Sequence, residues 1–147
     1  MNLLWDIGHE QTALGKVKKG VKLATEGKIE SAISLYKEAQ ELDSDVEITA
    51  WNWNRLCWYG NLNKQADKVM FACEKAVQLR PNYGWNHHNR GLARALTGDF
   101  PGAISDFQAY VEWTTNDKEK AKRQGWIDSL KKGENPFTSE VLEDLRN

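Results

Sequence analysis

Two adjacent histidines and a cysteine are the side chains of this sequence with the most obvious chemistry. His87 and His88 could bind a metal, but no cysteine or carboxylate stands at ligand spacing from them, and His9 is far away in sequence. Cys57 could act as a nucleophile with a histidine as base. Nothing in the sequence supplies an oxyanion hole or an orienting carboxylate. We therefore expect no metal site, no cofactor and no catalytic centre, and the protein should not be an enzyme.

Residues 98–102 have the sequence Gly-Asp-Phe-Pro-Gly, which is not a phosphate-binding loop because the spacing and the Lys-Ser/Thr pair of that motif are missing. The run is typical of a tight turn between two helices. Gly98 can end one helix in a left-handed conformation. Asp99 can accept the free N–H groups of the next helix, and Pro101 is tolerated in its first turn.

The same pattern occurs earlier in the chain. Gly20 and Gly91 are 71 residues apart, as are Gly27 and Gly98. This offset is close to two repeats of about 34 residues, so the sequence predicts a third, more divergent unit between the two copies.

The apolar residues follow helical spacing, and no segment shows the alternation of a strand, so we expect an all-α protein. Residues 1–147 should form a single domain. Residues 3–9 could form a short capping helix at the N-terminal end, or the end of a helix that begins further upstream. The remaining chain is divided into three helix pairs and C-terminal capping helices, at about residues 13–45, 46–82, 83–115 and 117–146.

The middle unit is about three residues longer than the third. We expect its turn at Tyr59-Gly60-Asn61 and its second helix from about Asn63 to Leu79, lengthened by one extra turn. The acidic residues of the chain show no paired arrangement, and we expect them on solvated helix faces.

Composition limits the classes of function. The chain of 147 residues is 40% hydrophobic and 28% charged, which predicts a folded domain. Its net charge of −1 gives no electrostatic basis for binding nucleic acid. No apolar run approaches the roughly 20 residues of a membrane span. The start of the chain lacks the features of a signal peptide, so we expect a cytoplasmic protein. Cys57 and Cys73 both fall on apolar helical patterns and should be free, buried thiols.

These residues resemble the tetratricopeptide repeat (TPR) family, whose unit of about 34 residues is a helix pair. Tyr110 stands where the family's second alanine is expected, and Ser44 and Thr115 replace prolines. The resemblance covers about residues 13–115 and implies a right-handed superhelical stack of three helix pairs with a concave groove that binds proteins. The matching residues are Gly20, Gly27, Ala32, Tyr36 and Ala39, then Ala66, Ala76 and Pro81, and finally Gly91, Gly98-Asp99-Phe100 and Ala103.

A narrower resemblance links residues 53–60, 72–77, 90–99, 123–127 and 133–138 to TPR modules at the C-terminus of bacterial multidomain proteins. Some of those proteins carry a caspase-like or trypsin-like peptidase domain. This resemblance implies an alternative function, in which the chain is an oligomerisation or regulatory module of a larger protein.

Tryptophans on the first helices of the second and third units are the main candidates for partner binding. In a TPR stack these helices line the groove, and an aromatic side chain beside Asn and Arg can anchor a peptide or a partner helix. Large aromatics also fill wide spaces between helices, and a Trp-rich face could mediate self-association. The predicted partner-binding residues are Val17, Val21, Lys22, Trp51, Asn52, Arg55, Trp58, Tyr59, Trp85, His88, Asn89 and Leu92.

Overall fold

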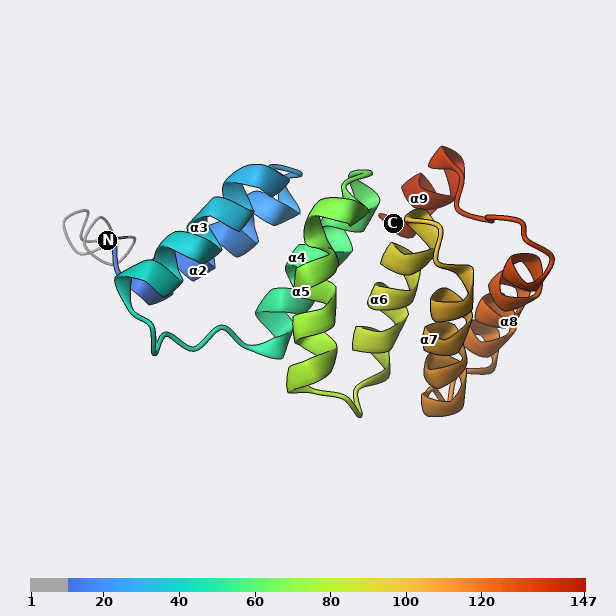
Figure 1. Cartoon of the computed structure of the whole chain (residues 1–147). Helices are drawn as coiled ribbons and strands as arrows, with labels where there is room; N and C mark the ends of the chain where they lie inside the picture. The colour runs from blue at the N-terminus through green and yellow to red at the C-terminus, as the bar shows by residue number, and fades with distance from the viewer. Residues whose placement is uncertain (1–10) are drawn as a thin grey trace.

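The computed structural model describes residues 11–147, and the capping helix expected at residues 3–9 lies outside this range. The described residues form helices and no strand, which confirms the all-α fold (Figure 1). None of these helices is long and apolar enough to cross a membrane. The helices are α2 (Ala13–Thr25), α3 (Ile29–Leu42), α4 (Ala50–Leu62), α5 (Ala66–Leu79), α6 (Gly84–Leu96), α7 (Phe100–Trp113), α8 (Asp117–Lys131) and α9 (Ser139–Leu145).

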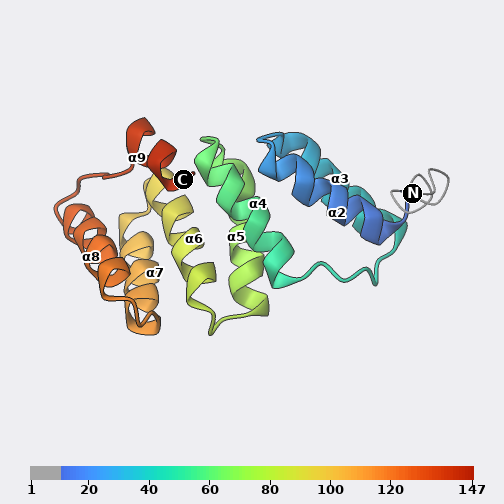
Figure 2. The same ribbon diagram turned by 180° about the vertical axis from the view of Figure 1, so that it is seen from behind.

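Helices α2 to α7 form three consecutive pairs that lie side by side along the molecule (Figures 1 and 2). The first helices of neighbouring pairs are in contact, α2 with α4 and α4 with α6, and α5 also packs against α6. Helix α8 covers α7. Helix α9 turns back to α4, where the Arg146 guanidinium donates a hydrogen bond of 2.7 Å to the carbonyl oxygen of Leu62.

The first and third pairs are held close together at a glycine. A Cβ atom at Gly20 would lie 2.7 Å from the ring of Tyr36, and one at Gly91 would lie 3.2 Å from the ring of Phe107. A side chain at Gly20 would force the Tyr36 ring to move, and one at Gly91 would press on the Phe107 ring. The two glycines therefore let an aromatic ring from the second helix pack directly on the backbone of the first.

The middle pair uses a covalent bond at the equivalent position. Cys57 and Cys73 form a disulfide across α4 and α5, with a Cα–Cα distance of 4.9 Å, and both side chains are fully buried. They are 16 residues apart, the same separation as in the glycine–aromatic pairs. The prediction of buried cysteines is confirmed, but the prediction of free thiols is wrong. The helical pattern places each sulfur in the core without indicating that the two face each other.

A left-handed residue follows the first helix of every pair. Gly27 has φ of 84° and Gly98 has φ of 91°, as the turn analysis predicted, and Lys64 takes this position in the middle pair with φ of 60°. The turn predicted at residues 59–61 is wrong, because these residues lie inside α4, which continues to Leu62. The turn was misplaced because the middle pair has Lys64 at the left-handed position, where the other two pairs have a glycine that marks the turn.

The extra turn predicted in the second helix of the middle pair is also wrong. Helices α3, α5 and α7 each have 14 residues. The additional residues lie instead in the connection 43–49 before α4, which is longer than the connection 80–83 before α6.

A buried carboxylate joins α6 to α7, contrary to the expectation that acidic residues lie on solvated faces. Asp106 receives two hydrogen bonds from Arg90, at 2.9 and 2.8 Å, and one from Arg94 at 3.1 Å. Nδ1 of His87 lies 3.4 Å from the same carboxylate. The bond to Asp106 raises the pKa of the Arg90 guanidinium. Because Asp106 is nearly inaccessible to water, these partners replace its hydration.

We expect Asp106→Asn to lower the free energy of unfolding by about 2–3 kcal/mol, because the neutral amide leaves Arg90 and Arg94 without a counter-charge in a partly buried site. Urea denaturation followed by circular dichroism measures the change. Asp128→Asn is the control, since Asp128 is exposed and its replacement should change stability by less than about 0.5 kcal/mol. Equal stabilities for the two variants would contradict this role of Asp106.

We also expect a reducing agent to lower the unfolding free energy by about 3 kcal/mol, because the disulfide closes a loop whose entropy the reduced, unfolded chain regains. Guanidinium titrations with and without dithiothreitol measure the difference. A variant with Cys57→Ala and Cys73→Ala should be insensitive to the reductant. Two free thiols in the denatured, unreduced protein would contradict the disulfide.

Candidate binding pocket

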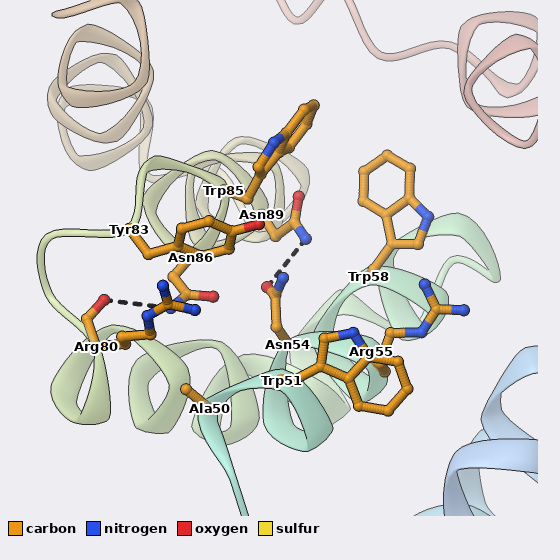
Figure 3. A pocket seen from close by; sticks show the side chains of 10 residues that line it. All are labelled: Ala50, Trp51, Asn54, Arg55, Trp58, Arg80, Tyr83, Trp85, Asn86 and Asn89. Atoms are coloured by element: carbon orange, nitrogen blue, oxygen red, sulfur yellow. Dashed lines mark hydrogen bonds between the residues drawn. The ribbon is translucent and has the colours of Figure 1, made fainter. Parts of the chain in front are cut away.

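A pocket of about 290 Å³ opens between α4 and α6, beside the connection that precedes α6 (Figure 3). Its wall consists of aromatic rings, two guanidinium groups and three side-chain amides. The lining residues are Ala50, Trp51, Asn54, Arg55 and Trp58 from α4, Arg80 and Tyr83 from the connection, and Trp85, Asn86 and Asn89 from α6.

Helical spacing places the α4 residues on one face. Trp51, Asn54, Arg55 and Trp58 are separated by three or four residues, so their side chains leave the helix in one direction. The start of α4 is fixed by a capping box in which Thr49 and Asn52 each accept a hydrogen bond from the backbone of the other.

Asn86 holds the connection before α6 in place. Its side-chain amide donates hydrogen bonds of 3.2 Å to the carbonyl oxygens of Ala76 and Arg80. These bonds fix the segment that carries Tyr83 into the pocket wall. The Arg80 guanidinium stacks on the Tyr83 ring, 4.4 Å from its centroid.

Arg55 lies between two aromatic rings of its own helix. Its guanidinium carbon is 5.3 Å from the centroid of the Trp51 ring and 4.8 Å from that of Tyr59, and one of its nitrogens donates to the Tyr59 hydroxyl at 2.9 Å. The Nε atom of Arg55 is buried without a hydrogen-bond partner among the described residues. Trp51 itself remains 59% exposed. Stacking thus orients the cation while the indole stays open to solvent.

Side-chain amides connect the two helices across the pocket. Asn89 of α6 donates a hydrogen bond of 2.9 Å to the side-chain oxygen of Asn54 of α4, at the centre of Figure 3. Asn61, which is fully buried in α4, donates one of 2.9 Å to the carbonyl oxygen of Asn89. The two bonds fix the distance between α4 and α6 at the site.

A buried histidine lies next to these amides. Nε–H of Arg123, on α8, donates to Nε2 of His88 at 3.0 Å, so the proton of the neutral ring is on Nδ1 and is donated to the side-chain oxygen of Asn89 at 2.8 Å. Burial lowers the pKa of His88 to about 3, and the charge of Arg123 contributes in the same direction. The pocket amides are therefore linked to α8 through a neutral imidazole.

Arg123 is surrounded by aromatic rings. Its guanidinium lies 5.7 Å from the centroid of Trp85, 5.2 Å from Tyr110 and 4.7 Å from Trp126, and it forms an ion pair with Glu119. Burial lowers the pKa of this guanidinium. The Trp85 indole thus contacts the Arg123 guanidinium and also lines the pocket.

The structure brings five of the twelve predicted partner-binding residues together in the pocket, namely Trp51, Arg55, Trp58, Trp85 and Asn89. The other seven lie elsewhere. Val17, His88 and Leu92 are fully buried, Val21 and Tyr59 are half-buried against the core, Asn52 is the capping residue and Lys22 is exposed on α2 outside the pocket. The three buried residues offer no surface to a partner in this conformation.

The other five residues of the wall, Ala50, Asn54, Arg80, Tyr83 and Asn86, are not among the predicted partner-binding residues. Asn54 stands three residues after Trp51, and this spacing could have placed it on the same face. Arg80 and Tyr83 lie in a connection without periodicity, so no pattern pointed to them. Among residues 11–147 no three His, Cys, Asp or Glu side chains lie close enough together to hold a metal ion.

No family model matches this chain, and neither the curated proteins nor the solved structures include a match to it.

We expect the stability of the protein to depend on His88 between about pH 3 and pH 6.5. The unfolded chain binds a proton at His88 below pH 6.5, whereas the folded protein does so only near pH 3. Over this range the unfolded state binds more protons, so the unfolding free energy falls with decreasing pH by up to about 1.4 kcal/mol per unit.

Urea titrations at several pH values compare the wild type with His88→Gln, which lacks this contribution. The difference between the two slopes isolates His88 from the carboxylates that titrate in both proteins. A ring resonance of His88 that titrates near pH 6.5 in NMR spectra of the folded protein would contradict the prediction.

Proposed function

We propose that the chain is a TPR-type helical repeat that binds a protein or peptide partner, without catalysis, in the pocket between α4 and α6. The repeated register supports the repeat assignment. Three helix pairs share one position of close approach, one left-handed residue after the first helix and one length of the second helix. A right-handed superhelical stack follows from this assignment, and the first helices α2, α4 and α6 would then face its groove.

The observation that carries the binding proposal is the exposure of Trp51 within a pocket shared with Trp58 and Trp85. Tryptophans that fill space between helices are buried, and Trp53 and Trp126 are examples in this protein. An indole that remains open to water beside a concave surface is typical of an anchor for a partner.

Adjacent helix pairs supply the two walls of the pocket, and the amide bridge between Asn54 and Asn89 keeps them at a fixed spacing. A site whose walls are already positioned loses little conformational entropy on binding. A volume of about 290 Å³ fits a few side chains of an extended segment. Affinity would therefore depend on one or two anchors and not on a large buried area.

The cytoplasmic location expected from the sequence remains a prediction. The Cys57–Cys73 disulfide bears on it, because disulfides persist mainly in oxidising compartments and are rare in the reducing cytosol. Alkylating the protein inside the cell and counting its free thiols would distinguish the reducing cytosol, where two thiols are expected, from an oxidising compartment, where none is expected.

We expect Trp51→Ala to weaken binding of the partner at least about 30-fold, because the indole is the most exposed anchor of the pocket. Stability should change by less than about 1 kcal/mol, since little of this side chain is buried. A partner is first recovered with the immobilised chain and identified by mass spectrometry, and its affinity is then measured by titration calorimetry. Trp51 is preferred to Trp85 for this test because the Trp85 ring also packs against Tyr110 and His88, so its removal would affect stability as well as binding.

Leu42→Ala is the matched control, because Leu42 is 57% exposed and lies outside the pocket. It should leave the affinity unchanged within about twofold. Equal affinities for Trp51→Ala and the wild type would contradict the assignment of the pocket. A mass that doubles with concentration in light scattering, with loss of Trp51 exposure, would favour self-association instead.

A further inference from the structure

We infer that the segment bound in this pocket is acidic, with an aromatic side chain flanked by aspartate or glutamate side chains. The inference rests on the proposed function, since it names the chemistry of the partner that the same pocket would take. It comes from the charges of the wall and from the arginines that have no counter-charge within the protein.

The arginines of the protein fall into two groups. Four of the six form ion pairs with carboxylates, namely Arg90, Arg94, Arg123 and Arg146. Arg55 and Arg80 form none with the described residues, and both line the pocket. The unpaired guanidinium groups are therefore concentrated at one place on the molecule.

No carboxylate lines the pocket, so its wall carries two positive charges that are not neutralised locally. The chain as a whole has a net charge of −1, with 20 basic and 21 acidic residues. The positive field at the pocket is a local feature and not a consequence of a basic protein. An anionic segment is the ligand that complements it.

The two cations are held in defined positions. The Trp51 and Tyr59 rings hold Arg55, whose Nε has no partner, while the Tyr83 ring holds Arg80. Stacking on a ring leaves the nitrogen edge of a guanidinium free to donate to a carboxylate. Neither guanidinium pairs with a carboxylate among the described residues, although one nitrogen of Arg55 donates to the Tyr59 hydroxyl. Both can therefore form an ion pair with a carboxylate of a ligand.

The placement of the two cations on different segments, Arg55 on α4 and Arg80 in the connection before α6, favours side-chain carboxylates over a single chain terminus. Figure 3 shows Arg80 and Arg55 on either side of Asn54, with the indoles of Trp51, Trp58 and Trp85 distributed around the same space. One terminal carboxylate would engage one of the two guanidinium groups. Acidic residues on both sides of an aromatic anchor can engage both while the ring contacts the indoles.

The experiment uses three end-capped peptides with a central tryptophan flanked on both sides by glutamate, glutamine or lysine. Binding is measured by titration calorimetry at about 50 mM and about 500 mM NaCl, since charge pairing is screened at the higher concentration. We expect the glutamate peptide to bind at least about tenfold more tightly than the glutamine peptide and to lose this advantage at high salt. The lysine peptide should bind most weakly.

Arg55→Gln and Arg80→Gln should each weaken binding of the glutamate peptide by about fivefold or more, with little effect on the glutamine peptide. Lys132→Gln is the control, because Lys132 is exposed at the end of α8 and lies outside the pocket. A variant with Arg55→Glu and Arg80→Glu should prefer the lysine peptide. Circular dichroism verifies that each variant retains its helical content.

The outcomes separate this inference from the function on which it rests. Equal binding of the three peptides, weakened by Trp51→Ala, would overturn the acidic preference and leave the peptide-binding function standing. Absence of binding by all three would overturn the acidic ligand, and the partner experiment with Trp51→Ala would still decide the function. A short oligothymidylate that binds more tightly than the glutamate peptide would also overturn it, in favour of a nucleic acid.

Discussion

In each helix pair the two helices approach each other closely at the same position of the repeat. Gly20 and Gly91 achieve it by having no side chain, so that the ring of Tyr36 or Phe107 rests on the helix backbone. The middle pair achieves it with the Cys57–Cys73 disulfide. The two solutions are chemically unlike. In both, the two residues that meet are sixteen positions apart in the sequence. Each close approach sets the geometry within one pair, and the pocket lies between the first helices of the second and third pairs, α4 and α6.

The contact between α4 and α6 includes the buried polar side chains Asn61 and Asn89. Asn61 stands at the position that Ala24 and Ala95 occupy in the other pairs, and all three are buried. A buried amide is costly without partners, and the Asn61 side-chain nitrogen finds one in the carbonyl oxygen of Asn89, while its side-chain oxygen has none among the described residues. The bond has one satisfactory geometry, whereas apolar side chains could slide past one another. Polar contacts therefore determine how the second pair sits against the third, at some cost in stability.

Features that recur in every repeat could be predicted from the sequence. Features of the middle pair, where a different residue stands at the repeated position, could not. Glycines at the left-handed turns and the apolar spacing predicted the helices and three pairs. The middle pair was misjudged where it substitutes another residue for the repeated one, with Lys64 in place of a turn glycine and cysteines in place of glycine and an aromatic. In the pocket, the resemblance to TPR repeats, whose first helices line a groove, pointed to the tryptophans on α4 and α6. It could not identify Arg80, which reaches the wall only through the path of a connection.

The Trp85 ring on the α6 wall is packed more tightly than the Trp51 ring on the α4 wall. Under the proposed function, this difference would decide how each wall responds to a ligand. On α6 the Trp85 ring rests against His88 and Tyr110, and Arg123 lies over its face, so that it has little freedom to turn. On α4 the Trp51 ring is mostly exposed and contacts the Arg55 guanidinium. Under the proposed function, a ligand would restrict the exposed Trp51 ring further at a cost in side-chain entropy, but it would meet Trp85 already packed. If the pocket binds a partner as proposed, the α6 wall would discriminate by shape and the α4 wall would adapt to the bound segment.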